Sequence, residues 1–170
     1  IGRDQITPES LASLLNGIDA EKVELNFISC IKNASKIGEE LSSYFKKQGI
    51  DLQKVKGSIG FDPFKRILKH GRDFPKYADM AEQVINSVSE LPGYRVLMAD
   101  AFMLNNAGSY ITQELGFALA WGNEWLSVLT DKGLTVDKVA NRIKFNFGIS
   151  SNYFMEMAKF RAARMLWAQI

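Results

Sequence analysis

The stretch "YRVLMADAFML", residues 94–104, is largely apolar on both faces of an extended chain. A strand with one solvated face usually alternates apolar and polar residues, whereas an apolar strand is typical of a parallel sheet that helices cover on both sides. We therefore predict a buried strand over residues 94–104. The polar residues "NNAGS" follow it, and they predict a turn at Gly108 and a helix N-cap at Ser109.

Strands and helices alternate on both sides of this segment. The sequence predicts further strands at 22–30, 54–61 and 143–150, and helices at 7–17, 33–49, 78–91, 109–132 and from 151 onward. Four such units indicate an α/β fold with parallel strands. A closed (β/α)8 TIM barrel needs about 250 residues, so we interpret residues 1–170 as a single fragment of a barrel domain. A small, open doubly wound sheet is the alternative.

The ends of the sequence agree with a fragment. Residue 1 is Ile rather than Met, and the last segment stops without a Gly, Asn or Pro to end its helix. We therefore expect a larger protein.

Composition narrows the classes of partner. The 21 basic and 19 acidic residues are interspersed, so neither nucleic acid nor an anionic membrane is an expected partner. No apolar run reaches the roughly 20 residues that a membrane helix needs. The single cysteine, Cys30, is expected to be a small buried apolar residue in a reducing, cytoplasmic setting.

In either α/β fold, chemistry belongs at the carboxyl ends of the strands. These ends read "NFISC", "SIGFDP", "MLNNAGS" and "FGISSN". His70 is the only histidine, which excludes a metal site with two histidines, and we expect it to be a solvated residue at a helix end. Asp62 and Asp100 are candidate general bases, but Asp62 precedes a proline and fits a turn, and Asp100 needs a partner inside its strand. The "GSIG" segment lacks the spacing of a phosphate-binding loop.

Apolar side chains of the later helices have structural interpretations. We predict one stripe of the last helix to pack on the sheet: Met155, Ala158, Ala162, Met165 and Leu166. Trp121 and Trp125 belong either to the core or to a partner surface.

Several segments resemble the methylmalonyl-CoA mutase family. The resemblance is carried by "GSIGFDPF", by "SYITQELGFALAWGNEWLSVLTDKGLTVDKVANR", and by "IKFNFGIS" followed by "NYFMEMAKFRAARMLWAQI". It implies part of the TIM barrel through which the acyl-CoA chain threads. It also implies adenosylcobalamin as the cofactor of the holoenzyme, the interconversion of methylmalonyl-CoA and succinyl-CoA, and a place in propionate metabolism.

The catalytic positions of that family are degenerate here. The resemblance places the family's tyrosine at Phe102, its histidine at Met103 and its glutamate at Asn106. Its glutamine falls on Gly60, and its substrate-binding arginine falls near His70. Methionine forms no strong hydrogen bond and glycine has no side chain.

Loss of this polar set makes the chain resemble the small, non-catalytic subunit of the family's heterodimers. The implied partner is a catalytic large subunit that binds the acyl-CoA. The family's cobalamin-binding domain, with its Asp-x-His-x-x-Gly motif, is not present in this chain, so we expect the fragment to bind no cobalamin. The alternative is an active enzyme, either a divergent acyl-CoA mutase or an unrelated barrel that uses Asp62, Asp100 and His70.

Overall fold

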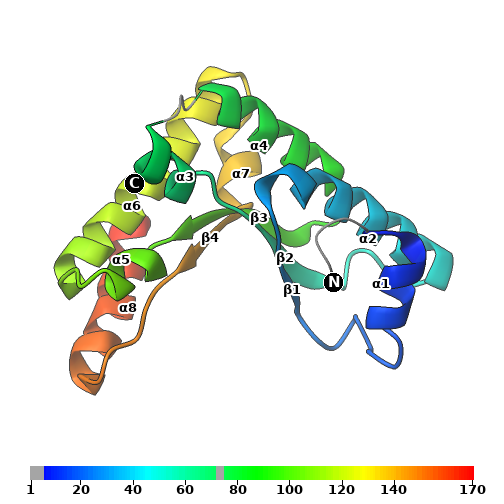
Figure 1. The fold of residues 1–170 in the computed structure, drawn as a ribbon, viewed down its shortest axis with the longest axis horizontal. Helices are drawn as coiled ribbons and strands as arrows, with labels where there is room; N and C mark the ends of the chain where they lie inside the picture. The colour runs from blue at the N-terminus through cyan, green and yellow to red at the C-terminus, as the bar shows by residue number, and fades with distance from the viewer. Residues whose placement is uncertain (1–5, 72–74) are drawn as a thin grey trace. The chain divides into compact units, whose positions relative to one another are not determined.

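The computed structural model describes residues 6–71 and 75–170. It divides into two compact units, unit 1 up to Leu97 and unit 2 from Met98 onward. Figure 1 shows the order of the elements along the chain. Unit 1 contains α1 (Pro8–Leu14), β1 (Leu25–Ile28), the 3-10 turn η1 (Ile31–Asn33), α2 (Ala34–Gln48), β2 (Lys56–Phe61), α3 (Phe64–His70), α4 (Pro75–Ser87) and most of β3 (Gly93–Asp100). Unit 2 contains the end of β3, α5 (Phe102–Asn106), α6 (Ile111–Asp131), α7 (Val136–Ala140), β4 (Ile143–Asn146) and α8 (Tyr153–Trp167).

The strands form a sheet in the order of the sequence, β1-β2-β3-β4. The pairs β1/β2 and β2/β3 are parallel, and Ile28 lies opposite Gly60 in the first pair. Strand order in a doubly wound sheet reverses at a switch point, whereas strands of a barrel follow one another. The predicted α/β fold is therefore confirmed, and the order fits part of a (β/α)8 barrel.

The core of unit 1 lies between the sheet and its helices. Helix α2 buries Ile37, Leu41 and Phe45 at helical spacing, and it packs against α4, which lies beside it in Figure 1. A Cβ atom at Gly38 would collide with the side chain of Ser87, so glycine permits the close approach of these two helices. Helix α2 ends at Gly49, whose φ of 68° is in the left-handed region.

The core of unit 2 is built around α6, which packs against α7 and α8. Trp125 and Leu129 are fully buried, and Trp121 is 4% exposed. The interpretation of both tryptophans as core residues is confirmed, and their assignment to a partner surface is wrong. An indole ring buries a large apolar area, which helix packing in this unit uses.

Strand β3 ends earlier than predicted. It stops at Asp100, and residues 102–104, expected as strand, form the short helix α5. The backbone N–H groups of Leu104 and Asn105 donate to the carbonyl of Ala101, which closes the first helical turn. An apolar run does not reveal where extended backbone becomes helical, so the sequence alone misplaced this boundary.

The turn between α5 and α6 is confirmed only in part. Gly108 has the expected positive φ, 90°. The N-cap of α6 is Tyr110 rather than Ser109, and the Gln113 side chain accepts a hydrogen bond from the Tyr110 N–H at 2.9 Å. The Ser109 hydroxyl instead donates to the carbonyl of Leu104 at the end of α5. The side chain of Ser109 thus closes the preceding helix.

Two other local expectations are corrected. Between the strand predicted at 54–61 and the helix predicted at 78–91, where no element is expected, the structure has α3, which ends at Gly71 with a φ of 58°. Cys30 is exposed rather than buried, because it follows the end of β1 and precedes η1, outside the packed strand. Residues 72–74 lie outside the described residues.

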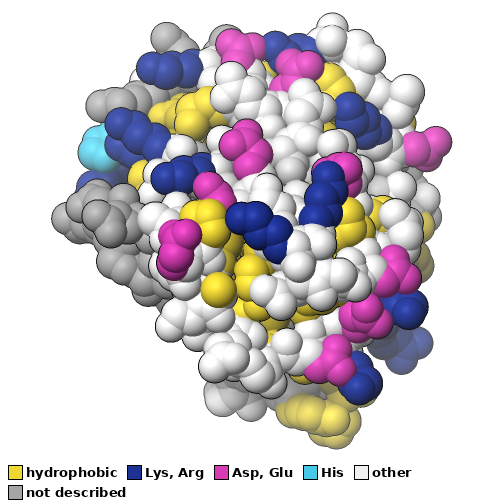
Figure 2. All heavy atoms as spheres, turned by 90° about the vertical axis from the view of Figure 1, so that its right-hand side faces the viewer, with side chains coloured by type: hydrophobic (Ala, Val, Ile, Leu, Met, Phe, Trp, Pro, Cys, Tyr) yellow, Lys and Arg dark blue, Asp and Glu magenta, His cyan; other side chains and the backbone are white. Residues whose placement is uncertain are grey.

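The surface carries charges of both signs. Figure 2 shows acidic and basic side chains together on one face of the molecule. In the part of the chain that the structure describes, no helix has the length and apolar character required to cross a bilayer.

Candidate functional site

The strand end "SIGFDP" belongs to β2, which packs closely against β1. The "GSIG" segment, 57–60, lies within β2 and is buried. A Cβ atom at Gly57 would collide with the Leu25 carbonyl of β1, so glycine lets the two strands approach. Asp62 follows, and its Oδ1 accepts a hydrogen bond from the N–H of Phe64 at 2.9 Å. This Asx turn starts α3 and confirms the structural interpretation of Asp62.

His70 is the last residue of α3. Its side chain is exposed, and Gly71 ends the helix immediately after it. The interpretation of His70 as a solvated residue at a helix end is confirmed. Of the family's catalytic positions, unit 1 thus contains Gly60, which lies in a buried strand, and His70, which lies on the surface.

The positions of the family's tyrosine, histidine and glutamate lie together on α5 in unit 2. Phe102 is 45% exposed, Met103 is half-buried and Asn106 is exposed. Helix α5 packs against the start of α6. An aromatic ring, a thioether and one neutral amide therefore occupy this turn, and none of them titrates near neutral pH.

Asp100 ends β3 beside this turn. Its Oδ1 accepts a hydrogen bond from Nδ2 of Asn146 at the end of β4. A carboxylate held in this way fastens two strand ends together. The expected partner of Asp100 is therefore a structural one.

A buried charge cluster was missed by the sequence reasoning. The side chains of Lys159 on α8 and Glu114 on α6 are both 0% exposed, and Nζ of Lys159 lies 2.7 Å from Oε2 of Glu114. The same Nζ lies 2.7 Å from Oε2 of Glu156 and 2.7 Å from the Gly148 carbonyl. Nζ donates hydrogen bonds to two of these groups, Oε2 of Glu114 and the Gly148 carbonyl, and forms an ion pair with the third.

The two carboxylates also hold the backbone after β4. Oε1 of Glu114 accepts from the Gly148 N–H at 2.6 Å, and Oε1 of Glu156 accepts from the Ser150 N–H at 3.1 Å and from its hydroxyl at 2.7 Å. Burial raises the pKa of Glu156, but the interaction with the Lys159 ammonium and the hydrogen bonds from Ser150 together outweigh it and hold the pKa below its ordinary value. The cluster therefore fixes the β4–α8 loop.

The cluster also corrects the predicted face of α8. Met155 is 46% exposed and Met165 is 61% exposed, so the predicted apolar stripe does not pack on the sheet. Glu156 and Lys159 lie on the buried face instead, three residues apart. Their spacing, together with Glu114 near the start of α6, was the available signal. Charged side chains are almost never fully buried unless paired, and the sequence did not show that these residues meet.

Comparison with known proteins places this fold in a family. The family model described as methylmalonyl-CoA mutase matches residues 6–170. The chain belongs to the methylmalonyl-CoA mutase family. It is 52% identical to the methylmalonyl-CoA mutase small subunit of Porphyromonas gingivalis over 97% of this chain and 27% of that protein.

Two proteins of Streptomyces virginiae are also similar to this chain. The methylmalonyl-CoA mutase small subunit is 36% identical over 81% of this chain and 22% of its own length. The methylmalonyl-CoA mutase large subunit is 32% identical over 74% of this chain and 18% of its own length. The chain thus spans about a quarter of the length of the curated relatives it matches.

Proposed function

We propose that this chain is part of the barrel of a small, non-catalytic subunit of a methylmalonyl-CoA mutase. In this proposal it supports a catalytic large subunit, which binds the acyl-CoA and interconverts methylmalonyl-CoA and succinyl-CoA in propionate metabolism. Similarity to small subunits from two organisms supports the assignment. The similarity to a large subunit supports a heteromeric partner of the same family.

The observation that carries the proposal is the chemistry of α5. The resemblance puts the family's tyrosine, histidine and glutamate at Phe102, Met103 and Asn106, which here share one helical turn. A hydrogen bond to a charged group contributes about 1.5–3 kcal/mol. Without a hydroxyl, an imidazole and a carboxylate, this turn lacks the contacts that would hold a substrate and stabilise its transition state.

The residues of this chain do not fit adenosylcobalamin as a resident cofactor. The only histidine, His70, is exposed at the end of α3 and is preceded by Leu68 where the family's cobalamin motif has its aspartate. The described residues contain no group of three or more His, Cys, Asp or Glu side chains suited to hold a metal ion. In our proposal, the cobalamin of the holoenzyme is held outside this chain, and no catalytic step runs through these residues.

We also propose a cytoplasmic setting, because the one cysteine, Cys30, is exposed as a free thiol.

The proposal is tested by expressing the full-length small subunit alone, the large subunit alone, and both together. Mutase turnover is then measured with methylmalonyl-CoA and adenosylcobalamin. We expect no turnover from the small subunit alone, and stable turnover when the two are co-expressed. Turnover by the small subunit alone would overturn the assignment. Failure of the two subunits to co-purify would overturn the supporting role.

A further inference from the structure

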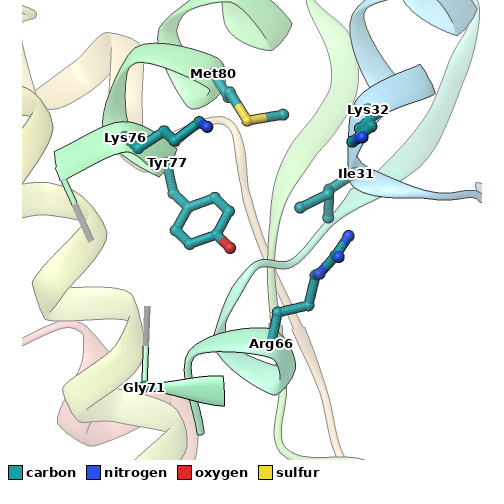
Figure 3. Close-up of a pocket in the computed structure, with 7 residues that line it drawn as sticks. All are labelled: Ile31, Lys32, Arg66, Gly71, Lys76, Tyr77 and Met80. Atoms are coloured by element: carbon teal, nitrogen blue, oxygen red, sulfur yellow. The ribbon is translucent and has the colours of Figure 1, made fainter. Parts of the chain in front are cut away.

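Unit 1 contains a pocket that the proposed function does not use. It has a volume of about 450 Å³ and lies beyond the carboxyl ends of β1 and β2, between η1, α3 and α4. Its lining is shown in Figure 3: Ile31, Lys32, Arg66, Gly71, Lys76, Tyr77 and Met80. Ligand sites in proteins typically have volumes of about 300–1,000 Å³, so the pocket is large enough for a small molecule.

Three cationic side chains from three separate elements line this pocket. Lys32 comes from η1, Arg66 from α3 and Lys76 from α4, and none of the described lining residues is acidic. In the described part of unit 1, the ion pairs join other lysines and Arg95 to carboxylates elsewhere on the surface, and none includes these three cations. The charges of the pocket lining therefore favour an anion.

The remaining lining residues add a neutral donor and apolar surface. Tyr77 is 5% exposed, and Figure 3 shows its hydroxyl pointing into the space that the Arg66 guanidinium also enters. Ile31 is buried and Met80 is half-buried, so together they give the pocket an apolar wall. A single inorganic anion would leave that wall unused.

We propose that this pocket binds a small organic phosphate. The planar guanidinium of Arg66 matches two phosphate oxygens, while Lys32 of η1 and Lys76 of α4 supply further positive charge. The Tyr77 hydroxyl donates to a third oxygen or to the ester oxygen, and the organic group lies against Ile31 and Met80. Phosphate binding here does not depend on the catalytic inactivity of the chain.

The test measures binding to the full-length small subunit by calorimetry at low ionic strength, with AMP, inorganic phosphate and adenosine as probes. AMP should bind with a dissociation constant below about 1 mM, more tightly than inorganic phosphate, and adenosine should not bind. Raising the salt concentration should weaken the binding of AMP. Equal binding of AMP and adenosine, or the absence of saturable AMP binding, would overturn the proposal.

Variants locate the site. Arg66→Gln should weaken AMP binding at least about tenfold, the loss expected for a charge-assisted hydrogen bond, and Lys76→Gln should weaken it less. Arg95→Gln is the matched control, because Arg95 pairs with Glu24 and does not line the pocket. Circular dichroism checks that each variant is folded. Unchanged affinity in a folded Arg66→Gln variant, or equal losses in that variant and the control, would place the binding elsewhere and refute the assignment.

Discussion

Lys159 is the residue whose replacement should disturb unit 2 most. The variant Lys159→Met keeps the length of the side chain and removes its charge. It deletes the three contacts of 2.7 Å to Glu114, Glu156 and the Gly148 carbonyl. Glu114, whose side chain is 0% exposed, then keeps only the donors Gly148 N–H and Asn105 Nδ2 among its described contacts.

The magnitude follows from these contacts. Two charge-assisted hydrogen bonds at about 1.5–3 kcal/mol each sum to roughly 3–6 kcal/mol, and the ion pair with Glu156 is lost as well. Removing the charge also removes the desolvation cost of the buried ammonium, and measured losses for breaking a buried pair are about 3–5 kcal/mol. We expect a loss of about 3–5 kcal/mol in the free energy of unfolding, a large share of the roughly 5–15 kcal/mol that holds a typical domain.

Urea unfolding followed by tryptophan fluorescence measures this loss, since all three tryptophans lie in unit 2. The control Arg164→Met replaces an exposed cation on the same helix and should change stability by about 0.5 kcal/mol or less. The double variant Lys159→Met/Glu114→Gln should lose less than the sum of the single variants, because the uncompensated carboxylate is gone. A loss below about 1 kcal/mol for Lys159→Met would refute the assignment of a structural role to the cluster.

Three further outcomes are expected. The folded-state pKa of Glu156 lies below its ordinary value of 4.5, so its contribution to stability is present above about pH 4.5 and is lost as the pH falls through the folded pKa. When the pH is lowered through this range, the urea midpoint should fall less for Glu156→Gln than for the unsubstituted protein. Gly122→Ala should cost about 1–3 kcal/mol because the new methyl group would lie within 2.9 Å of aromatic ring atoms, whereas Gly116→Ala, with open space around it, should gain up to about 1 kcal/mol in the same unfolding experiment. Met103→His should give no mutase turnover in the full-length small subunit assayed alone, since one imidazole does not restore the other polar side chains; measurable turnover would contradict the assignment of lost chemistry.

Local sequence signals predicted much of the fold. The sequence predicts a helix from residue 7, and Thr7 is the N-cap of α1, where its hydroxyl accepts from the Ser10 N–H at 3.2 Å. The helix predicted to end at residue 49 does so, and Gly49 and the turn residue Gly108 have positive φ values, which glycine adopts without strain. Caps and left-handed turns are determined by a few neighbouring residues, which a sequence displays directly.

Long-range contacts were beyond the same reasoning. Glu114 and Lys159 are 45 residues apart, and their pairing depends on the packing of α6 against α8. The buried face of α8 was misassigned for the same reason, because Glu156 and Lys159 are buried and the methionines are exposed. Of the candidate site, the sequence left Asp62 and Asp100 open between a general base and a structural residue, and the structure shows a turn and a strand-end hydrogen bond. The charged cluster and the cationic pocket required the structure.

The absence of a working substrate site in this barrel is tested most directly by the number of acyl-CoA molecules that one heterodimer binds. Equilibrium dialysis of the purified full-length heterodimer with radiolabelled methylmalonyl-CoA gives this number. We predict one molecule per heterodimer, bound by the large subunit, and no change when Met103→Ala is introduced in the small subunit. Two molecules per heterodimer, with one lost in that variant, would contradict the account.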